Sequence, residues 1–221
     1  MDESTSSIRN LLVDSPTSVG QHLRSRRWYW LRTYFPDVES MSVIDLGGTA
    51  EAWLRAPVRP SFLHIVNIEP DMPGELPAWL RVEQGDACAL PQHIRNASYD
   101  LVFSNSVLEH VGGHMQRTRF AETVHELAKL HWVQTPYRYF PIEPHWLFPG
   151  FHFLPLAARA RISAVWPLAH TKSIDWHEGL DAAMGVELLS RSEMAYYFPS
   201  SDILRERLAG LTKSLIAVKS K

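Results

Sequence analysis

A short apolar run that ends in a carboxylate and two glycines constrains this chain more than any other feature. Residues 42–49 read SVIDLGGT, the pattern of a buried parallel strand that delivers a sharp turn and then opens a helix. Gly47 and Gly48 allow backbone conformations and close approaches that a Cβ atom would block. Such a turn at the end of a sheet strand predicts a ligand site, although plain connections also use glycine.

Two further carboxylates follow strand-like segments. Glu69 comes after residues 62–68, and Asp86 comes after residues 80–85. With Asp45, they would line one edge of an open α/β sheet, where such sheets bind ligands. Carboxylates suit ribose hydroxyls and an exocyclic amine but repel a pyrophosphate. The turn also lacks the G-x-G-x-x-G spacing that a nicotinamide dehydrogenase requires.

Composition limits the class of protein. The chain has 221 residues, of which 45% are hydrophobic, enough for a single domain over residues 1–221. A formal net charge of -2 argues against a chain that coats nucleic acid. The one cysteine, Cys88, excludes an internal disulfide framework and a multi-cysteine zinc motif. The first residues lack the pattern of a signal peptide, and no apolar run reaches the roughly 20 residues of a membrane span, so we expect a cytoplasmic protein.

Alternating strand-like and helix-like segments indicate a parallel sheet with helical crossovers. A helical N-terminal segment (1–40) precedes them, and its arginines and aromatics favour an amphipathic helix over an RNA-binding surface. The short connection near residue 210 is too short for a helical crossover and predicts an antiparallel hairpin at the C-terminus. The expected helices are 19–35, 50–54, 107–110 and 116–130, and the expected strands are 42–46, 62–68, 80–85, 100–104, 131–134, 203–208 and 215–218.

Over residues 42–134 the chain resembles the class I S-adenosylmethionine-dependent methyltransferases, in particular their type 11 branch. The shared features, in order, are the DLGGT turn, the two later acidic residues and the segment NSVLEHV at 105–111. The resemblance implies a Rossmann-like methyltransferase fold of the α/β class, with a seven-stranded, mainly parallel sheet, helices on both faces and an antiparallel C-terminal hairpin. It also implies S-adenosyl-L-methionine as cofactor.

The resemblance assigns roles to individual residues. The turn would pass the methionine part of the cofactor, Glu69 would bind the ribose hydroxyls, and Asp86 with Ala87 would read the adenine edge. The implied cofactor-binding residues are Asp45, Gly47, Gly48, Thr49, Glu69, Asp86, Ala87 and Ser104. The family usually has a third glycine at alternate spacing, where this chain has Thr49 and Glu51. That departure leaves open a non-catalytic binding or scaffold protein on the same fold.

Candidate catalytic residues lie in two segments. His110 follows the fourth strand, and Glu143 with His145 lies in a stretch rich in proline and aromatic residues after the fifth strand. We expect residues 135–180 to form an acceptor-side lid or insertion, in which these side chains could deprotonate an acceptor. A structural histidine and a lid that merely packs on the sheet are the alternatives. His110 and His114 have metal-pair spacing, but without a third ligand we expect no metal site.

The preferred acceptor is a small-molecule or glycolipid hydroxyl oxygen, because the chain lacks the Asn/Asp-Pro-Pro-Tyr/Phe signature of base and amide methylation. The apolar stretch 146–156 is either core or an exposed surface for a lipid-linked acceptor. Contact with a membrane surface stays open, nucleic acid is not expected as a partner, and the sequence makes no prediction of oligomeric state.

Overall fold

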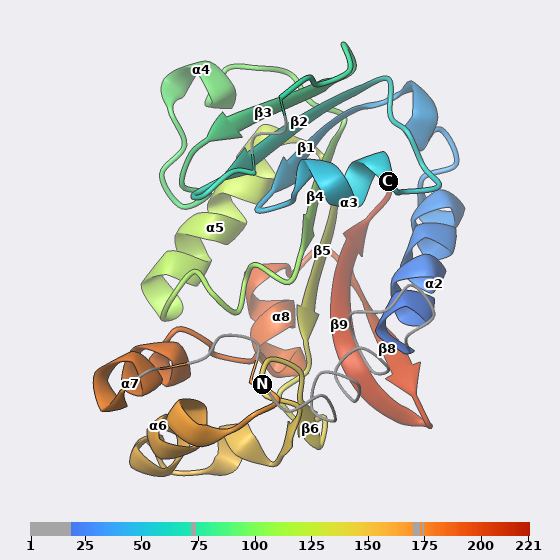
Figure 1. Cartoon of the computed structure of the whole chain (residues 1–221). Helices are drawn as coiled ribbons and strands as arrows, with labels where there is room; N and C mark the ends of the chain where they lie inside the picture. The colour runs from blue at the N-terminus through green and yellow to red at the C-terminus, as the bar shows by residue number, and fades with distance from the viewer. Residues whose placement is uncertain (1–18, 72–73, 170–172, 174) are drawn as a thin grey trace.

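A twisted seven-stranded sheet organises the molecule, in the order β3-β2-β1-β4-β5-β9-β8 (Figure 1). This computed structural model describes residues 19–71, 74–169, 173 and 175–221. The strands are β1 Ser42–Leu46, β2 Phe62–Asn67, β3 Leu80–Gln84, β4 Leu101–Asn105, β5 Leu130–Pro136, β8 Asp202–Leu208 and β9 Leu211–Lys219. The first five are parallel, while β9 runs antiparallel to both β5 and β8. The predicted α/β fold with its C-terminal hairpin is confirmed.

Helices cover both faces of the sheet, also as predicted (Figure 1). Those packed on the sheet are α2 Val19–Tyr34, α3 Ala50–Leu54, α4 Gln92–Arg95, α5 His114–Leu127 and α8 Arg191–Tyr197. Leu31 of α2 and Trp53 of α3 are buried against one face, whereas Phe120 of α5 and Met194 of α8 are buried against the other. The inner strands are buried on both sides and mostly apolar, as is typical of a doubly covered parallel sheet. No helix in the described ranges has the length and apolar character to cross a bilayer.

A separate unit lies between β5 and α8, in the region of the expected insertion. It contains β6 Ile142–Glu143, β7 Phe148–Pro149, η3 Phe151–Phe153, α6 Leu156–Val165 and α7 Trp176–Met184. Its small core is centred on Trp146, whose ring stacks on Phe151 at 4.1 Å between centroids. The apolar stretch 146–156 therefore divides: these two side chains are core, but Phe153 is 59% exposed. The core interpretation is confirmed for Trp146 and Phe151, and a role of the exposed Phe153 in binding an acceptor stays a prediction.

Two expected helices need correction. Residues 107–110 form a turn closed by the His110 N–H and the Val107 carbonyl at 2.8 Å, and Gly112 (φ 100°) prevents its extension as a helix. The helix expected at 116–130 spans 114–127. It ends where Ala128 turns extended, and the next strand begins at Leu130. Of the expected N-terminal segment, residues 1–18 lie outside the described residues.

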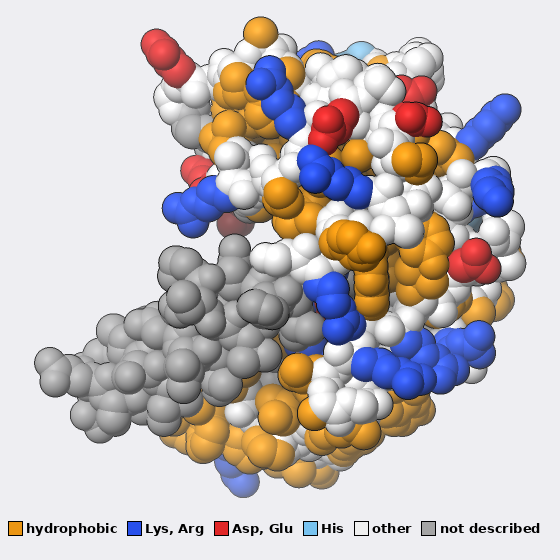
Figure 2. Space-filling model, turned by 90° about the vertical axis from the view of Figure 1, so that its right-hand side faces the viewer, with side chains coloured by type: hydrophobic (Ala, Val, Ile, Leu, Met, Phe, Trp, Pro, Cys, Tyr) orange, Lys and Arg blue, Asp and Glu red, His pale blue; other side chains and the backbone are white. Residues whose placement is uncertain are grey.

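The arginines of α2 mostly support packing. Figure 2 shows Lys and Arg side chains lying among exposed apolar groups on the face that carries α2 and β8. The Arg26 guanidinium lies over the Trp30 ring at 4.7 Å, and Arg32 pairs with Glu39 at 2.5 Å. Arg27 instead points inward to Glu206 of β8. These contacts favour the amphipathic-helix interpretation over a nucleic-acid surface.

Candidate functional site

The carboxyl ends of β1, β2 and β3 meet at one edge of the sheet. Leu46 pairs with Val66, and Asn67 pairs with Gln84. Because these strands are parallel, the loops that follow them leave the sheet on the same side. The exposed side chains Glu69 and Asp86 belong to these loops. The structure thus places both predicted carboxylates at the edge where the glycine turn begins.

The glycine turn is closely packed on both sides. Gly47 has φ 84°, in the left-handed region, and a Cβ atom there would lie 2.4 Å from Cγ2 of Val107. A Cβ atom on Gly48 would lie 1.8 Å from Oδ2 of Asp45. The Asn67 amide donates to the carbonyls of both glycines, at 3.1 and 3.0 Å. Glycine is therefore required by sterics at both positions, because no side chain fits there without moving Val107 or Asp45.

Asp45 supports this turn from inside the protein. It is 2% exposed, and its Oδ2 accepts a hydrogen bond from the Trp53 indole at 2.6 Å. Burial raises the pKa of Asp45 to about 7, and the indole hydrogen bond opposes the rise. Its Oδ1 has no hydrogen-bond partner within the described part of the chain. Thr49 has a similar local role, since its hydroxyl caps α3 by accepting from the Ala52 N–H at 3.3 Å.

The other predicted cofactor residues divide into exposed and internal ones. Asp86 is exposed, although its Oδ1 accepts the Cys88 N–H at 2.8 Å, and Ala87 beside it is buried. Ser104 is fully buried, and its hydroxyl donates to the Leu46 carbonyl at 2.8 Å. Ser104 therefore ties the ends of β4 and β1 together, while Asp86 stays accessible to a ligand.

The three catalytic candidates lie together. Nδ1 of His145 is 2.7 Å from Oε1 of Glu143, and Nε2 of His145 is 3.1 Å from Nε2 of His110. Glu143 is 1% exposed, and its other oxygen accepts the backbone N–H groups of His145 and Trp146. Residues from the loop after β4 and from the insertion thus form one chain, Glu143–His145–His110, which ends at the exposed His110.

Glu109 is a fourth member that sequence reasoning overlooked. It is 1% exposed; one oxygen accepts the Thr135 hydroxyl at 2.9 Å, and the other has no hydrogen-bond partner among the described residues. Burial raises the pKa of Glu109 to about 7, against the opposing effects of hydrogen bonds and nearby positive charge. One ligand atom from each of Glu109, His110 and His145 lies within 4.8 Å of the others. In the sequence, the position of Glu109 directly before His110 was the signal that could have indicated this role.

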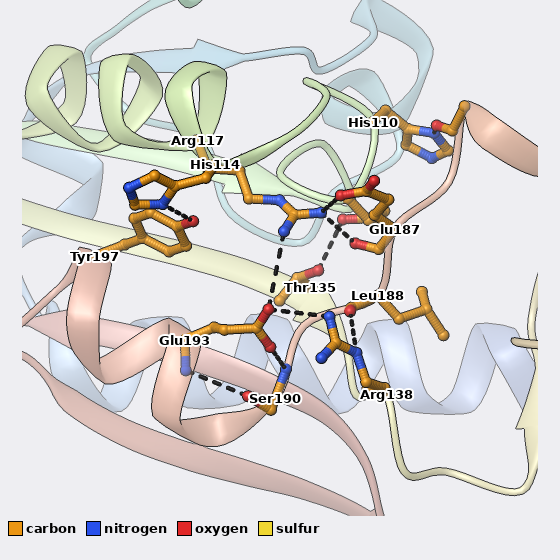
Figure 3. Close-up of polar contacts among 12 residues, drawn as sticks. His110, His114, Arg117, Thr135, Arg138, Glu187, Leu188, Ser190, Glu193 and Tyr197 are labelled. Carbon is orange, nitrogen blue, oxygen red and sulfur yellow. Dashed lines mark hydrogen bonds and ion pairs between the residues drawn. The ribbon is translucent and has the colours of Figure 1, made fainter. Parts of the chain in front are cut away.

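An ionic network fixes the backbone around this cluster (Figure 3). Arg117 of α5 is 4% exposed and donates to the carbonyl and carboxylate of Glu187. Arg138 donates to the Leu188 carbonyl and to Glu193 of α8. The Glu187 N–H donates in turn to the Glu109 carbonyl at 2.9 Å. The segment after α7 is thereby held against the loop that carries the cluster.

A second buried network lies at the ends of β4 and β5. The Arg27 guanidinium makes a bidentate contact with Glu206 at 2.9 and 2.8 Å and donates to Gln134 at 2.9 Å. Ser106, which also donates to Gln134, has φ 56°, a strained conformation for a non-glycine residue. No sequence pattern predicted these partners, because Arg27 and Glu206 are 179 residues apart.

No family model and no curated protein matches the sequence. Solved structures do match. The magnesium protoporphyrin IX methyltransferase of Synechocystis, solved with bound SAH, aligns with a TM-score of 0.54 at 12% identity over 99% of this chain and 95% of its own. An O-methyltransferase family protein from Burkholderia thailandensis aligns with a TM-score of 0.52 at 14% identity, over 98% of this chain and 60% of its own. The CurJ carbon methyltransferase aligns with a TM-score of 0.55 at 11% identity, over 97% of this chain and 58% of its own.

This chain has the class I methyltransferase fold. At these identities the likeness concerns the fold alone and does not extend to the type 11 branch. The names of the matched proteins include oxygen and carbon methylation. The methyltransferase fold therefore does not determine which atom is methylated, and the acceptor has to be inferred from the site.

The glycine turn of this methyltransferase fold gives a direct test. Gly48→Ala should destabilise the protein by about 3 kcal/mol, the upper range for overpacking, because its Cβ atom would meet the buried Asp45 carboxylate. Urea denaturation measures the change. Gly74→Ala is the matched control, since a Cβ atom there meets nothing within 4 Å. Equal stability of both variants would contradict the close packing of the turn.

Proposed function

We propose that this protein transfers a methyl group from S-adenosyl-L-methionine to a hydroxyl oxygen of a small-molecule or glycolipid acceptor. The observation that carries the proposal is the adjacency of two features. Gly47 packs against Val107, and the same loop continues into Glu109 and His110, which meets His145. The turn proposed to bind the cofactor thus leads into the loop that carries potential proton acceptors.

The turn and the sheet edge suit the cofactor. The glycine turn leaves β1 at this edge of the sheet, and Glu69 and Asp86 are exposed at neighbouring strand ends. These residues, with Ala87, would hold the nucleoside and the methionine part. The bound cofactor would supply an electrophilic methyl group on a sulfonium. The protein then has to align an acceptor with it, and alignment alone can contribute about 7–11 kcal/mol in ideal cases.

The histidine pair would take the acceptor's proton. Glu143 and His145 form a carboxylate–imidazole pair at 2.7 Å, so Nδ1 of His145 carries a hydrogen and Nε2 keeps a lone pair. The exposed His110 has the same arrangement of ring nitrogens, because its Nδ1 lies 3.2 Å from the Gly185 carbonyl and donates a hydrogen to it. A proton passed to this pair is stabilised by the buried Glu143 carboxylate.

The acceptor class is inferred from the insertion. Tyr139 and Phe153 are 57% and 59% exposed, and their rings stack at 6.2 Å. Ile142, 42% exposed, belongs to the same unit. Exposed apolar groups near the catalytic candidates favour an acceptor with an apolar part, such as a glycolipid at a membrane surface. We accordingly propose residues 135–180 as the acceptor-side lid of a single-domain enzyme.

Calorimetric titration with S-adenosylmethionine tests the function. Wild-type protein should bind saturably, and Glu69→Ala should weaken binding about 10–100-fold, because it removes a charged hydrogen-bond acceptor. Glu122→Ala, an exposed carboxylate on α5, should bind like wild type. Absence of binding at millimolar cofactor would instead favour a non-catalytic scaffold protein. That alternative is suggested by Thr49 and Glu51, which stand where the family usually has a glycine.

A further inference from the structure

We propose that the cluster of Glu109, His110 and His145 is a binding site for a divalent first-row transition-metal ion of the Zn²⁺ class. The ion would lie between the two histidine Nε2 atoms, with the Glu109 carboxylate as third ligand. The expectation of no metal site considered only the pair of His110 and His114. The structure separates that pair, since Nδ1 of His114 contacts the Tyr197 hydroxyl at 3.0 Å.

Hydrogen-bond partners determine the tautomers of both rings. Nδ1 of His145 faces the Glu143 carboxylate, and Nδ1 of His110 faces the Gly185 carbonyl. Both partners are pure acceptors when Glu143 is ionised, so each Nδ1 has to donate a hydrogen. Each neutral ring then presents a lone pair at Nε2. These atoms are 3.1 Å apart, a separation at which two facing lone pairs repel unless a proton or a metal ion lies between them.

The geometry fits coordination. Two nitrogens bound to Zn²⁺ at about 2.0–2.1 Å in a tetrahedral site lie roughly 3.3 Å apart, close to the observed 3.1 Å. Glu109 would supply negative charge: one of its carboxylate oxygens lies within 4.8 Å of the histidine ligand atoms, and Oε1 is buried with no hydrogen-bond partner among the described residues. A carboxylate this close to two imidazoles would gain a ligand bond from the ion.

The outer contacts are those that metal-bound histidines usually make. A ligating imidazole typically donates its other N–H to a carboxylate or a backbone carbonyl, and here one ring has each type of partner. Glu109 is likewise held by the Thr135 hydroxyl. Two imidazoles and one carboxylate are the donor set of many catalytic zinc sites, which keep a position open for an exogenous oxygen.

Ion binding itself does not depend on the proposed methyl transfer, but its chemical consequence does. In an active methyltransferase with the ion bound, the two Nε2 atoms would be ligands and no longer proton acceptors, and an acceptor hydroxyl in the open position would become more acidic by coordination. Its proton would leave to solvent, and the oxygen would keep the electron pair for the methyl group. The experiment therefore measures ion binding and cofactor binding separately.

The test is calorimetric titration of chelator-treated full-length protein with Zn²⁺, followed by titration with S-adenosylmethionine. Wild type and the control His114→Ala should bind Zn²⁺ equally. His110→Ala and His145→Ala should each weaken Zn²⁺ binding at least about 100-fold through loss of a ligand, and Glu109→Gln by about 10-fold. Thermal melts of each variant check that it is folded.

Nitrogen-15 histidine NMR of the wild-type protein provides a readout that needs no variant. Zn²⁺ should shift two Nε2 resonances and leave their Nδ1 partners protonated. Unchanged histidine resonances, or Zn²⁺ affinity retained in a folded double variant of His110→Ala and His145→Ala, would overturn the proposal. If the cofactor still binds in that case, only the metal site is wrong. If neither ligand binds, both proposals fail.

Discussion

Replacing Arg27 with methionine is expected to cost about 3–5 kcal/mol of the free energy of unfolding, the range found when one member of a buried ion pair is removed. Glu206 is fully buried and receives both of its ionic hydrogen bonds from Arg27. The variant would leave that charge without its partner and would also remove the Arg27 donor to Gln134. Urea denaturation followed by circular dichroism measures the loss.

Two further variants make this expectation specific. Arg32→Met removes an ion pair on the same helix whose side chains are 50% and 58% exposed, so it should cost no more than about 1 kcal/mol. The double variant of Arg27→Met and Glu206→Leu should recover much of the loss, because no charge stays buried. A single-variant loss equal to that of Arg32→Met would show that Arg27 does not fasten α2 to the C-terminal hairpin.

His110→Ala and His145→Ala should each lower turnover about 10²–10⁴-fold, the usual contribution of a general acid or base. Cofactor affinity should change far less, because neither side chain belongs to the loops after β1, β2 or β3. Steady-state kinetics on an acceptor found by a radiolabel screen give kcat and KM, and calorimetry gives cofactor affinity. The loss is therefore expected in kcat, with cofactor binding retained.

His93→Ala serves as the control for this pair. His93 is exposed on α4 and contacts Glu83 at 2.5 Å, away from the cluster, so its removal should leave kcat unchanged. Glu143→Gln should give part of the histidine effect, since it keeps the shape but removes the charge next to His145. Full turnover in both histidine variants would remove this pair from the mechanism.

The amino-acid sequence by itself determined the local elements and the edge where they end. Buried parallel strands such as 42–46 are apolar runs bounded by turn residues, and that pattern depends only on neighbours along the chain. The glycine turn was predictable for the same reason, because a missing Cβ atom is visible in the sequence. The parallel order of the strands then placed Glu69 and Asp86 at one edge, and three candidate catalytic residues were found as residue types suited to proton transfer.

Only the tertiary structure decided which of these side chains meet. The contact of His110 with His145 depends on how the insertion folds over the loop after β4, and the role of Glu109 depends on its burial, which adjacent residues do not reveal. Ser104 and Asp45 make internal hydrogen bonds that only the tertiary structure reveals, because their partners come from a neighbouring strand and from α3. Arg27 and Glu206 pair across nearly the whole chain. Contacts of this kind arise from packing between distant segments, which no local pattern encodes.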